Sequence, residues 1–145
     1  PQSDHRPYIS KNLRRKIADL ARQRCGYCLT AEEFTAMPMT IEHIIPLVAG
    51  GTSDEENLWL SCPICNGHKA MQTHHPDPES KQIVPLFNPR QQIWGEHFAW
   101  SESGVEIIGR TPIGRATVIA VQLNDERLTR ARRRWVLAGW HPPVD

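Results

Sequence analysis

The sequence predicts an α+β fold whose small core, two short strands and a helix, is held by a four-cysteine zinc knuckle. A basic helix is expected before this core, and a β-hairpin with helices after it. The main observation is that the four cysteines of the 145-residue chain form two Cys-x-x-Cys pairs, at 25–28 and 62–65. Structural zinc takes four tetrahedral ligands, which two such pairs supply as thiolates. Pairing of this kind fits a metal better than a disulfide framework, and so favours an intracellular protein.

An amphipathic helix is expected over residues 11–24, ahead of the first cysteine pair. Ser10 suits the N-cap position, and Leu13 and Ile17 recur at helical spacing. Residues 1–8 are polar and contain two prolines, which predicts a flexible lead-in over 1–9.

Between the cysteine pairs we expect the order strand, loop, strand and helix. The β-branched stretch 40–45 predicts a strand that Pro46 ends. Residues 57–60 predict the second strand, with a loop at the two glycines of 50–51 between them. Pro63 suits the first position of a helix.

The C-terminal half is expected to hold a hairpin and two helices. The prolines of 73–89 predict an irregular connection, whereas 97–101 and 105–109 flank a Glu-Ser-Gly turn and predict a hairpin. Helices are expected over 111–123 and, after a capping stretch, up to about Gly139. The candidate core anchors of this half are tryptophans, namely Trp94, Trp100, Trp135 and Trp140.

Charge is nearly balanced, at a formal net value of +1, so overall basicity does not indicate a nucleic-acid partner. Basic residues nevertheless gather in 11–24 and in 127–134. Two such segments can follow a phosphate backbone, and they are equally typical of solvated helix faces. No apolar run approaches the roughly 20 residues that span a bilayer, so no membrane partner is expected.

A second group of residues suggests a catalytic metal site. Neighbours on a regular strand point to opposite faces. Glu42 and His43 can nevertheless serve one site in different roles. Glu42 can bind a divalent cation, while His43 can act as a general base. Asn66 offers an amide oxygen to Mg²⁺ or Mn²⁺. Singly, each residue has an ordinary structural explanation, such as a core histidine or, for Asn57 and Asn66, a turn or helix-cap residue.

The joint pattern resembles the zinc-stabilised HNH endonuclease family, whose core is the ββα-metal fold. The resemblance covers about residues 25–69, in the order Cys-x-x-Cys, acid-His-Ile-Ile-Pro, Gly-Gly, Asn-Leu and Cys-x-x-Cys-Asn-x-x-Lys. Glu42 stands where aspartate is frequent in the family, and Asn66 where histidine is also common. His68 is an alternative ligand, but residues two apart on a helix face different ways.

The resemblance implies hydrolysis of DNA phosphodiester bonds, which leaves a 5′-phosphate and a 3′-hydroxyl. It implies that His43 activates the attacking water and that Asn57 holds the loop and orients His43. It also implies that Glu42 and Asn66 bind the catalytic cation, Mg²⁺, Mn²⁺ or another divalent ion. The structural zinc would be held by Cys25, Cys28, Cys62 and Cys65.

We therefore expect a lead-in over 1–9, a nuclease core over 10–75 and an extension over 76–145 packed on that core. DNA is the expected partner, and the oligomeric state is left open. The residues assigned to nucleic-acid contact are Arg14, Arg15, Lys69, Arg132 and Arg133. The alternatives are a non-catalytic zinc-ribbon module that binds nucleic acid and, more weakly, a redox protein that uses Cys-x-x-Cys. The extension either completes the core or grips phosphates with its arginines.

Overall fold

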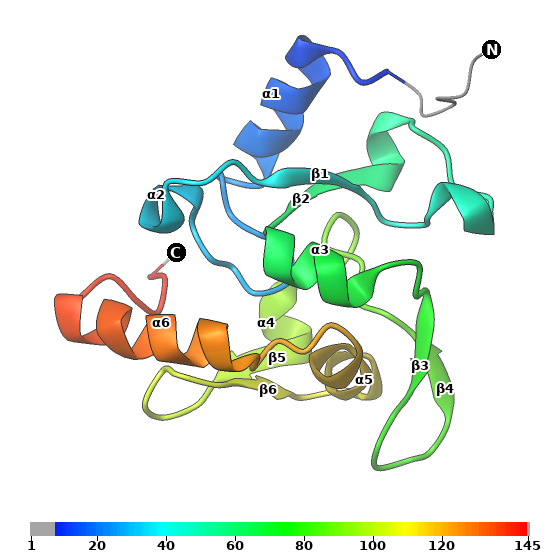
Figure 1. Ribbon diagram of the computed structural model, residues 1–145. Coiled ribbons are helices and arrows are strands. Elements are labelled where there is room, and N and C mark those ends of the chain that lie inside the picture. Colours follow the sequence, from blue (N-terminus) through cyan, green and yellow to red (C-terminus); the bar gives the residue numbers. More distant parts are fainter. Residues whose placement is uncertain (1–7, 145) are drawn as a thin grey trace.

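Two antiparallel strands and a helix form the centre of the cysteine-containing part of the chain. The structure, a computed structural model, describes residues 8–144. Strand β1 (Thr40–His43) pairs with β2 (Leu58–Ser61). Helix α1 (Lys11–Leu20) covers one face of this ribbon and α3 (Pro63–Lys69) the other (Figure 1). The predicted α+β class, with a ββα core beside a four-cysteine cluster, is confirmed.

Helix α1 is fixed on the ribbon by its cap and by one buried side chain. The Ser10 hydroxyl accepts a hydrogen bond from the N–H of Leu13, which satisfies a donor at the helix start. Ile17 is fully buried and packs with Ile9 and Leu58. Ile9, which the sequence placed at the end of the lead-in, is thus part of a small core, whereas the first seven residues of that lead-in lie outside the described residues.

Several elements are shorter than the sequence predicted. Helix α1 ends at Leu20 rather than at residue 24, because Arg22 and Gln23 adopt left-handed backbone conformations, with φ of 56° and 53°. Strand β1 ends at His43. Short helical turns not foreseen from the sequence are α2 (Glu32–Thr35), η1 (Leu47–Ala49) and η2 (Glu55–Asn57).

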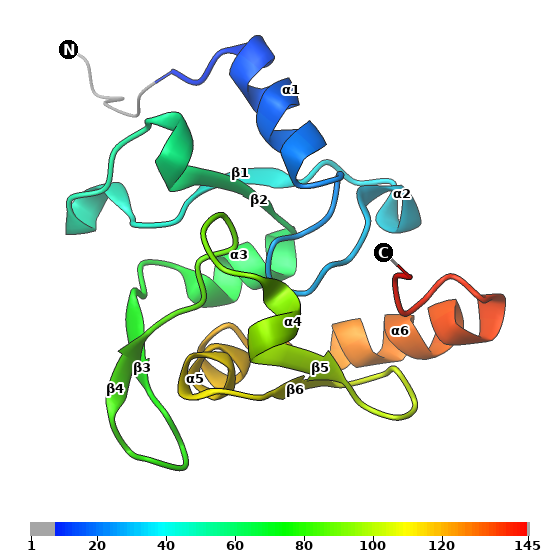
Figure 2. The ribbon, with the colours of Figure 1, turned by 180° about the vertical axis from the view of Figure 1, so that it is seen from behind.

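The extension has the predicted hairpin and both predicted helices. Its elements are α4 (Trp94–His97), β5 (Phe98–Trp100), β6 (Ile107–Gly109), α5 (Pro112–Ala120) and α6 (Glu126–Ala138). The side chains of Thr111 and Asp125 cap α5 and α6. Figures 1 and 2 show this extension beneath α3, on the side away from α1.

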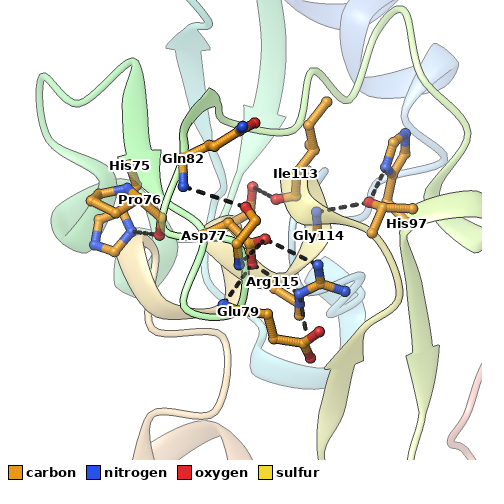
Figure 3. A network of polar contacts seen from close by, with 12 residues as sticks. His75, Pro76, Asp77, Glu79, Gln82, His97, Ile113, Gly114 and Arg115 are labelled. Atoms are coloured by element: carbon orange, nitrogen blue, oxygen red, sulfur yellow. Dashed lines mark hydrogen bonds and ion pairs between the residues drawn. The ribbon is translucent and has the colours of Figure 1, made fainter.

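A second hairpin lies where the sequence predicted an irregular connection. Strands β3 (His74–Pro76) and β4 (Ile83–Pro85) pair antiparallel, and their prolines lie at strand ends, where a missing N–H is tolerated. The buried carboxylate of Asp77 closes the turn by accepting from the N–H of Ser80 at 3.0 Å. Arg115 of α5 binds both oxygens of the same carboxylate at 2.8 and 3.0 Å (Figure 3). Asp77 therefore fastens the hairpin to the extension.

Replacing Asp77 with asparagine should lower the melting temperature by several degrees at pH 7. The Arg115 guanidinium holds the pKa of Asp77 well below its usual range. A carboxylate with a lowered pKa contributes its full stability above the unfolded-state value of about 4 and loses it as the pH falls. The difference between wild type and Asp77→Asn should therefore narrow below about pH 4 in thermal melts. Glu79→Gln is the matched control, because Glu79 is 71% exposed and lies 3.6 Å from Arg115. Equal melting temperatures at pH 7 would contradict this role.

The two halves of the chain share one hydrophobic core. The four cysteines belong to the same buried cluster as Phe98, Val121 and Leu123 of the extension. Trp94 and Trp100 pack on it and Trp135 is buried, whereas Trp140 is 54% exposed, so its prediction as a core anchor is wrong. No helix within residues 8–144 has the length and apolar character needed to cross a membrane.

Candidate active site

The four cysteines form a buried cluster with the dimensions of a zinc site. Their sulfur atoms all lie within 4.8 Å of one another, and the Sγ atoms of Cys28 and Cys62 are 3.7 Å apart. Sulfurs about 2.3 Å from a tetrahedral zinc would be about 3.8 Å apart. The zinc knuckle predicted from the cysteine spacing thus fits a tetrathiolate zinc centre.

Without a metal, the cysteines differ in how far they favour the charge that zinc ligands carry. Burial raises the pKa of Cys25, and hydrogen bonding with the sulfur of Cys25 raises that of Cys65. Hydrogen bonding with Cys25 instead lowers the pKa of Cys28, so only part of the set favours the thiolate. Four buried thiolates without a cation would repel one another at high energetic cost. The donor set therefore suits a bound zinc ion, which would hold all four in the ionised form.

Arg132 lies in the core and not on a DNA-facing surface, so its assignment to nucleic-acid contact is wrong. It is fully buried, and its guanidinium donates to the carbonyl oxygens of Val105 at 3.0 Å and Leu123 at 2.7 Å. The guanidinium also stacks on the ring of Trp100 at 5.5 Å. These contacts replace part of the hydration that the charge loses on burial, and the buried Nε of Arg132 makes no hydrogen bond within the described residues.

Glu42 points from β1 toward α3 and the zinc knuckle. It is 4% exposed, and its Oε2 accepts a hydrogen bond from the hydroxyl of Tyr27. The other oxygen, Oε1, lies 3.9 Å from Nζ of Lys69, which is longer than a hydrogen bond. Burial raises the pKa of Glu42 to about 7, while the charge of Lys69 and the hydrogen bond from Tyr27 oppose this rise. The carboxylate is therefore incompletely neutralised by its protein neighbours.

Lys69 is buried beneath the first strand, so its assignment to direct DNA contact is also wrong. It is 2% exposed, and its ammonium donates to the carbonyl oxygen of Ile44 at 2.9 Å. Burial lowers the pKa of Lys69. The side chain joins the end of α3 to the segment that follows His43.

His43 ends β1 and is partly buried. Its Nε2 lies 2.8 Å from the hydroxyl oxygen of Ser53. Burial lowers the pKa of His43, which favours the neutral imidazole at neutral pH. Ser53 was not foreseen, and its position just after the glycine pair was the only signal in the sequence.

Asn57 ties the two ends of the loop that follows His43. Its amide group donates to the carbonyl oxygens of Ile45 at 3.0 Å and Thr52 at 2.7 Å. Its Oδ1 accepts from the N–H of Ile45 at 2.9 Å. A Cβ on Gly51 would lie 1.8 Å from the Ile45 carbonyl oxygen, so only glycine permits this closure. The loop that carries Ser53 is therefore held in one shape.

Asn66 lies on α3, one helical turn before Lys69. Residues three apart on a helix share a face, so Asn66 is on the side of α3 that Lys69 turns toward Glu42. The Asn66 side chain makes no hydrogen bond within residues 8–144, and it is partly buried. The alternative ligand, His68, instead lies 2.8 Å from the carboxylate of Asp125.

The donor chemistry of this region fits a hard divalent cation. Carboxylate and amide oxygens are the ligands that Mg²⁺ and Mn²⁺ prefer. A buried carboxylate with a raised pKa gains from a nearby positive charge that favours its ionised form. Glu42 and Asn66 thus suit such an ion. Glu42 is directed toward Tyr27, whereas His43 points to the other face of β1, toward Ser53.

The other candidate DNA-binding residues lie on the surface. Arg14 and Arg15 are exposed on α1, and Arg133 is exposed on α6. The Arg14 side chain is partly fixed, because its Nε donates to the carbonyl oxygen of Ile9 at 3.2 Å. These three side chains are accessible to a phosphate backbone.

Comparison with known proteins identifies the central segment. Residues 25–72 match the model of a family described as HNH endonuclease. This segment contains both cysteine pairs together with Glu42, His43, Asn57 and Asn66. Comparison with curated proteins and with solved structures gives no match. The family match therefore covers residues 25–72 of this chain, and it supports activity of the nuclease type in general.

Proposed function

We propose that this protein is a metal-dependent endonuclease that hydrolyses DNA phosphodiester bonds, with His43 as the general base. The observation that carries the proposal is the state and setting of His43. Its imidazole is partly buried, has a lowered pKa and ends the first strand of the family-matched segment. Such a group is neutral at working pH and able to accept a proton.

The residues around His43 support this role. Nε2 takes a proton from the attacking water, and the Ser53 hydroxyl at 2.8 Å holds the ring until that water arrives. Asn57 keeps the loop of Ser53 closed on Ile45. Attack on phosphorus leaves a 5′-phosphate and a 3′-hydroxyl.

Glu42 and Asn66 would hold the divalent cation, and Cys25, Cys28, Cys62 and Cys65 the structural zinc. A bound Mg²⁺ or Mn²⁺ supplies stabilisation of the charge that develops on the phosphate and the leaving oxygen. Arg14, Arg15 and Arg133 are exposed and would contact DNA phosphates without reading sequence.

Supercoiled plasmid should be nicked by the zinc-loaded protein in the presence of Mg²⁺ or Mn²⁺. The nicks should be sealed by DNA ligase without prior kinase treatment, because the ends carry a 5′-phosphate and a 3′-hydroxyl. Glu42→Gln should reduce nicking by about 10-fold or more at limiting metal, since it removes the anionic ligand. Glu56→Gln is the matched control, because Glu56 is exposed on η2.

Binding without cleavage would refute the enzyme assignment. A gel shift of the plasmid with no nicking across Mg²⁺, Mn²⁺, Co²⁺ and Ni²⁺ would instead indicate a zinc-ribbon module that binds nucleic acid.

A further inference from the structure

Tyr27 lies inside the zinc knuckle, between the two cysteines of its first turn, and its side chain reaches Glu42. The residue is fully buried, and its carbonyl oxygen accepts from the indole N–H of Trp94 at 2.8 Å. Its own N–H lies 3.4 Å from the sulfur of Cys25. The position of the Tyr27 hydroxyl is therefore set by the turn that carries two zinc ligands.

The hydroxyl of Tyr27 acts as a hydrogen-bond donor to Glu42. An ionised carboxylate has no proton to donate and can only accept, so the phenol O–H is the donor in this contact. This donation fixes Oε2 of Glu42.

Lys69 and Tyr27 interact with the Glu42 carboxylate in different ways. Lys69 lies 3.9 Å from Oε1 and offers a positive charge without a close hydrogen bond. Tyr27 supplies a hydrogen bond without a charge, so it orients the carboxylate and leaves the negative charge available to a cation. Fixing a side chain with three rotatable bonds in advance also lowers the entropy cost of binding.

We propose that Tyr27 is a positioning residue that fixes Glu42 for the catalytic cation and so links that cation's affinity to the zinc knuckle. The proposal rests on the proposed function, in which Glu42 binds the cation. Hydrogen-bond partners of metal ligands typically contribute 10- to 100-fold to metal affinity. Tyr27 would otherwise be only a core side chain, since it also belongs to the main buried cluster.

Tyr27→Phe tests the proposal, because phenylalanine keeps the ring in the core and removes only the hydroxyl. Mn²⁺ binding would be measured by calorimetry on the zinc-loaded 145-residue protein in a His43→Ala background, so that the readout is independent of cleavage. We expect the Kd for Mn²⁺ to rise about 10- to 100-fold, with one zinc per chain retained. Tyr8→Phe is the matched control, since Tyr8 is 84% exposed.

A double-mutant cycle separates positioning from packing. Tyr27→Phe should have no further effect on Mn²⁺ binding in a Glu42→Gln background. An equal loss in both backgrounds, an unchanged Kd in Tyr27→Phe alone, or loss of zinc from that variant would each overturn the role of Tyr27. Unchanged binding in Glu42→Gln would instead refute the assignment of Glu42 as a ligand, and with it the proposed metal site.

Discussion

Replacing His43 with alanine should lower kcat for plasmid nicking by about 10²- to 10⁴-fold, the usual contribution of a general base. The side chain is partly buried and its ring contacts the Ser53 hydroxyl, so the substitution leaves the zinc knuckle untouched. Zinc content and the melting temperature should therefore stay close to those of the wild type. His74→Ala is the matched control, because His74 is an exposed histidine on β3 and should keep full activity.

The pH profile adds a second readout for His43. Because burial lowers the pKa of His43, the base remains neutral below the usual histidine value of about 6.5. With saturating Mn²⁺, the apparent pKa of the acidic limb in the profile of kcat against pH should lie below about 6.5. Full activity of His43→Ala would show that another group accepts the proton. An acidic limb of the kcat profile that is identical in wild type and His43→Ala would show the same.

Removing zinc should abolish the folded state. Structural zinc contributes about 10–16 kcal/mol of apparent binding free energy in small zinc modules, whereas a whole domain is typically stable by only 5–15 kcal/mol. The four cysteines also belong to the main hydrophobic cluster, so removing the ion would remove a four-way cross-link from the centre of the core. A strong chelator or Cys65→Ser should therefore eliminate the cooperative thermal transition seen by circular dichroism.

The control for zinc removal tests which metal restores folding of the chelated protein. Adding zinc back to the chelated wild type should restore the cooperative transition, and adding Mg²⁺ should not, because thiolates are poor ligands for Mg²⁺. A metal-free protein that melts at the wild-type temperature would show that the core is stable without the knuckle. Zinc content of about one per chain before chelation would also exclude a redox role for the Cys-x-x-Cys pairs.

The features that the sequence predicted well are encoded over short distances. Cysteine spacing predicted the metal cluster because each turn presents two sulfurs locally. Ser10 and Thr111 predicted helix starts because a cap acts within one helical turn. The β3–β4 hairpin was missed because its prolines indicated an irregular connection, and because the contact that fastens it runs from Asp77 to Arg115, 38 residues away.

The burial of Arg132 and Lys69 could have been predicted from their helical spacing relative to apolar residues. Arg132 follows the buried Leu128 by four residues and precedes the buried Trp135 by three, so it lies on the inward face of α6. Lys69 likewise follows the buried Cys65 by four residues on α3. Helical periodicity therefore indicated burial at both positions, and charge alone suggested a surface.

The buried position of Arg132 also bears on the net charge of the knuckle. Four thiolates around a Zn²⁺ ion carry a net charge of −2, which is costly in a low-dielectric interior. Burial lowers the pKa of Arg132, while the negative charge of nearby cysteine thiolates opposes this shift. The buried guanidinium therefore brings one positive charge from the far end of the chain. This arginine lies outside the segment that matches the family model. With zinc bound, the extension would supply a counterion for the metal centre, and a domain cut at the family boundary would lose that compensation.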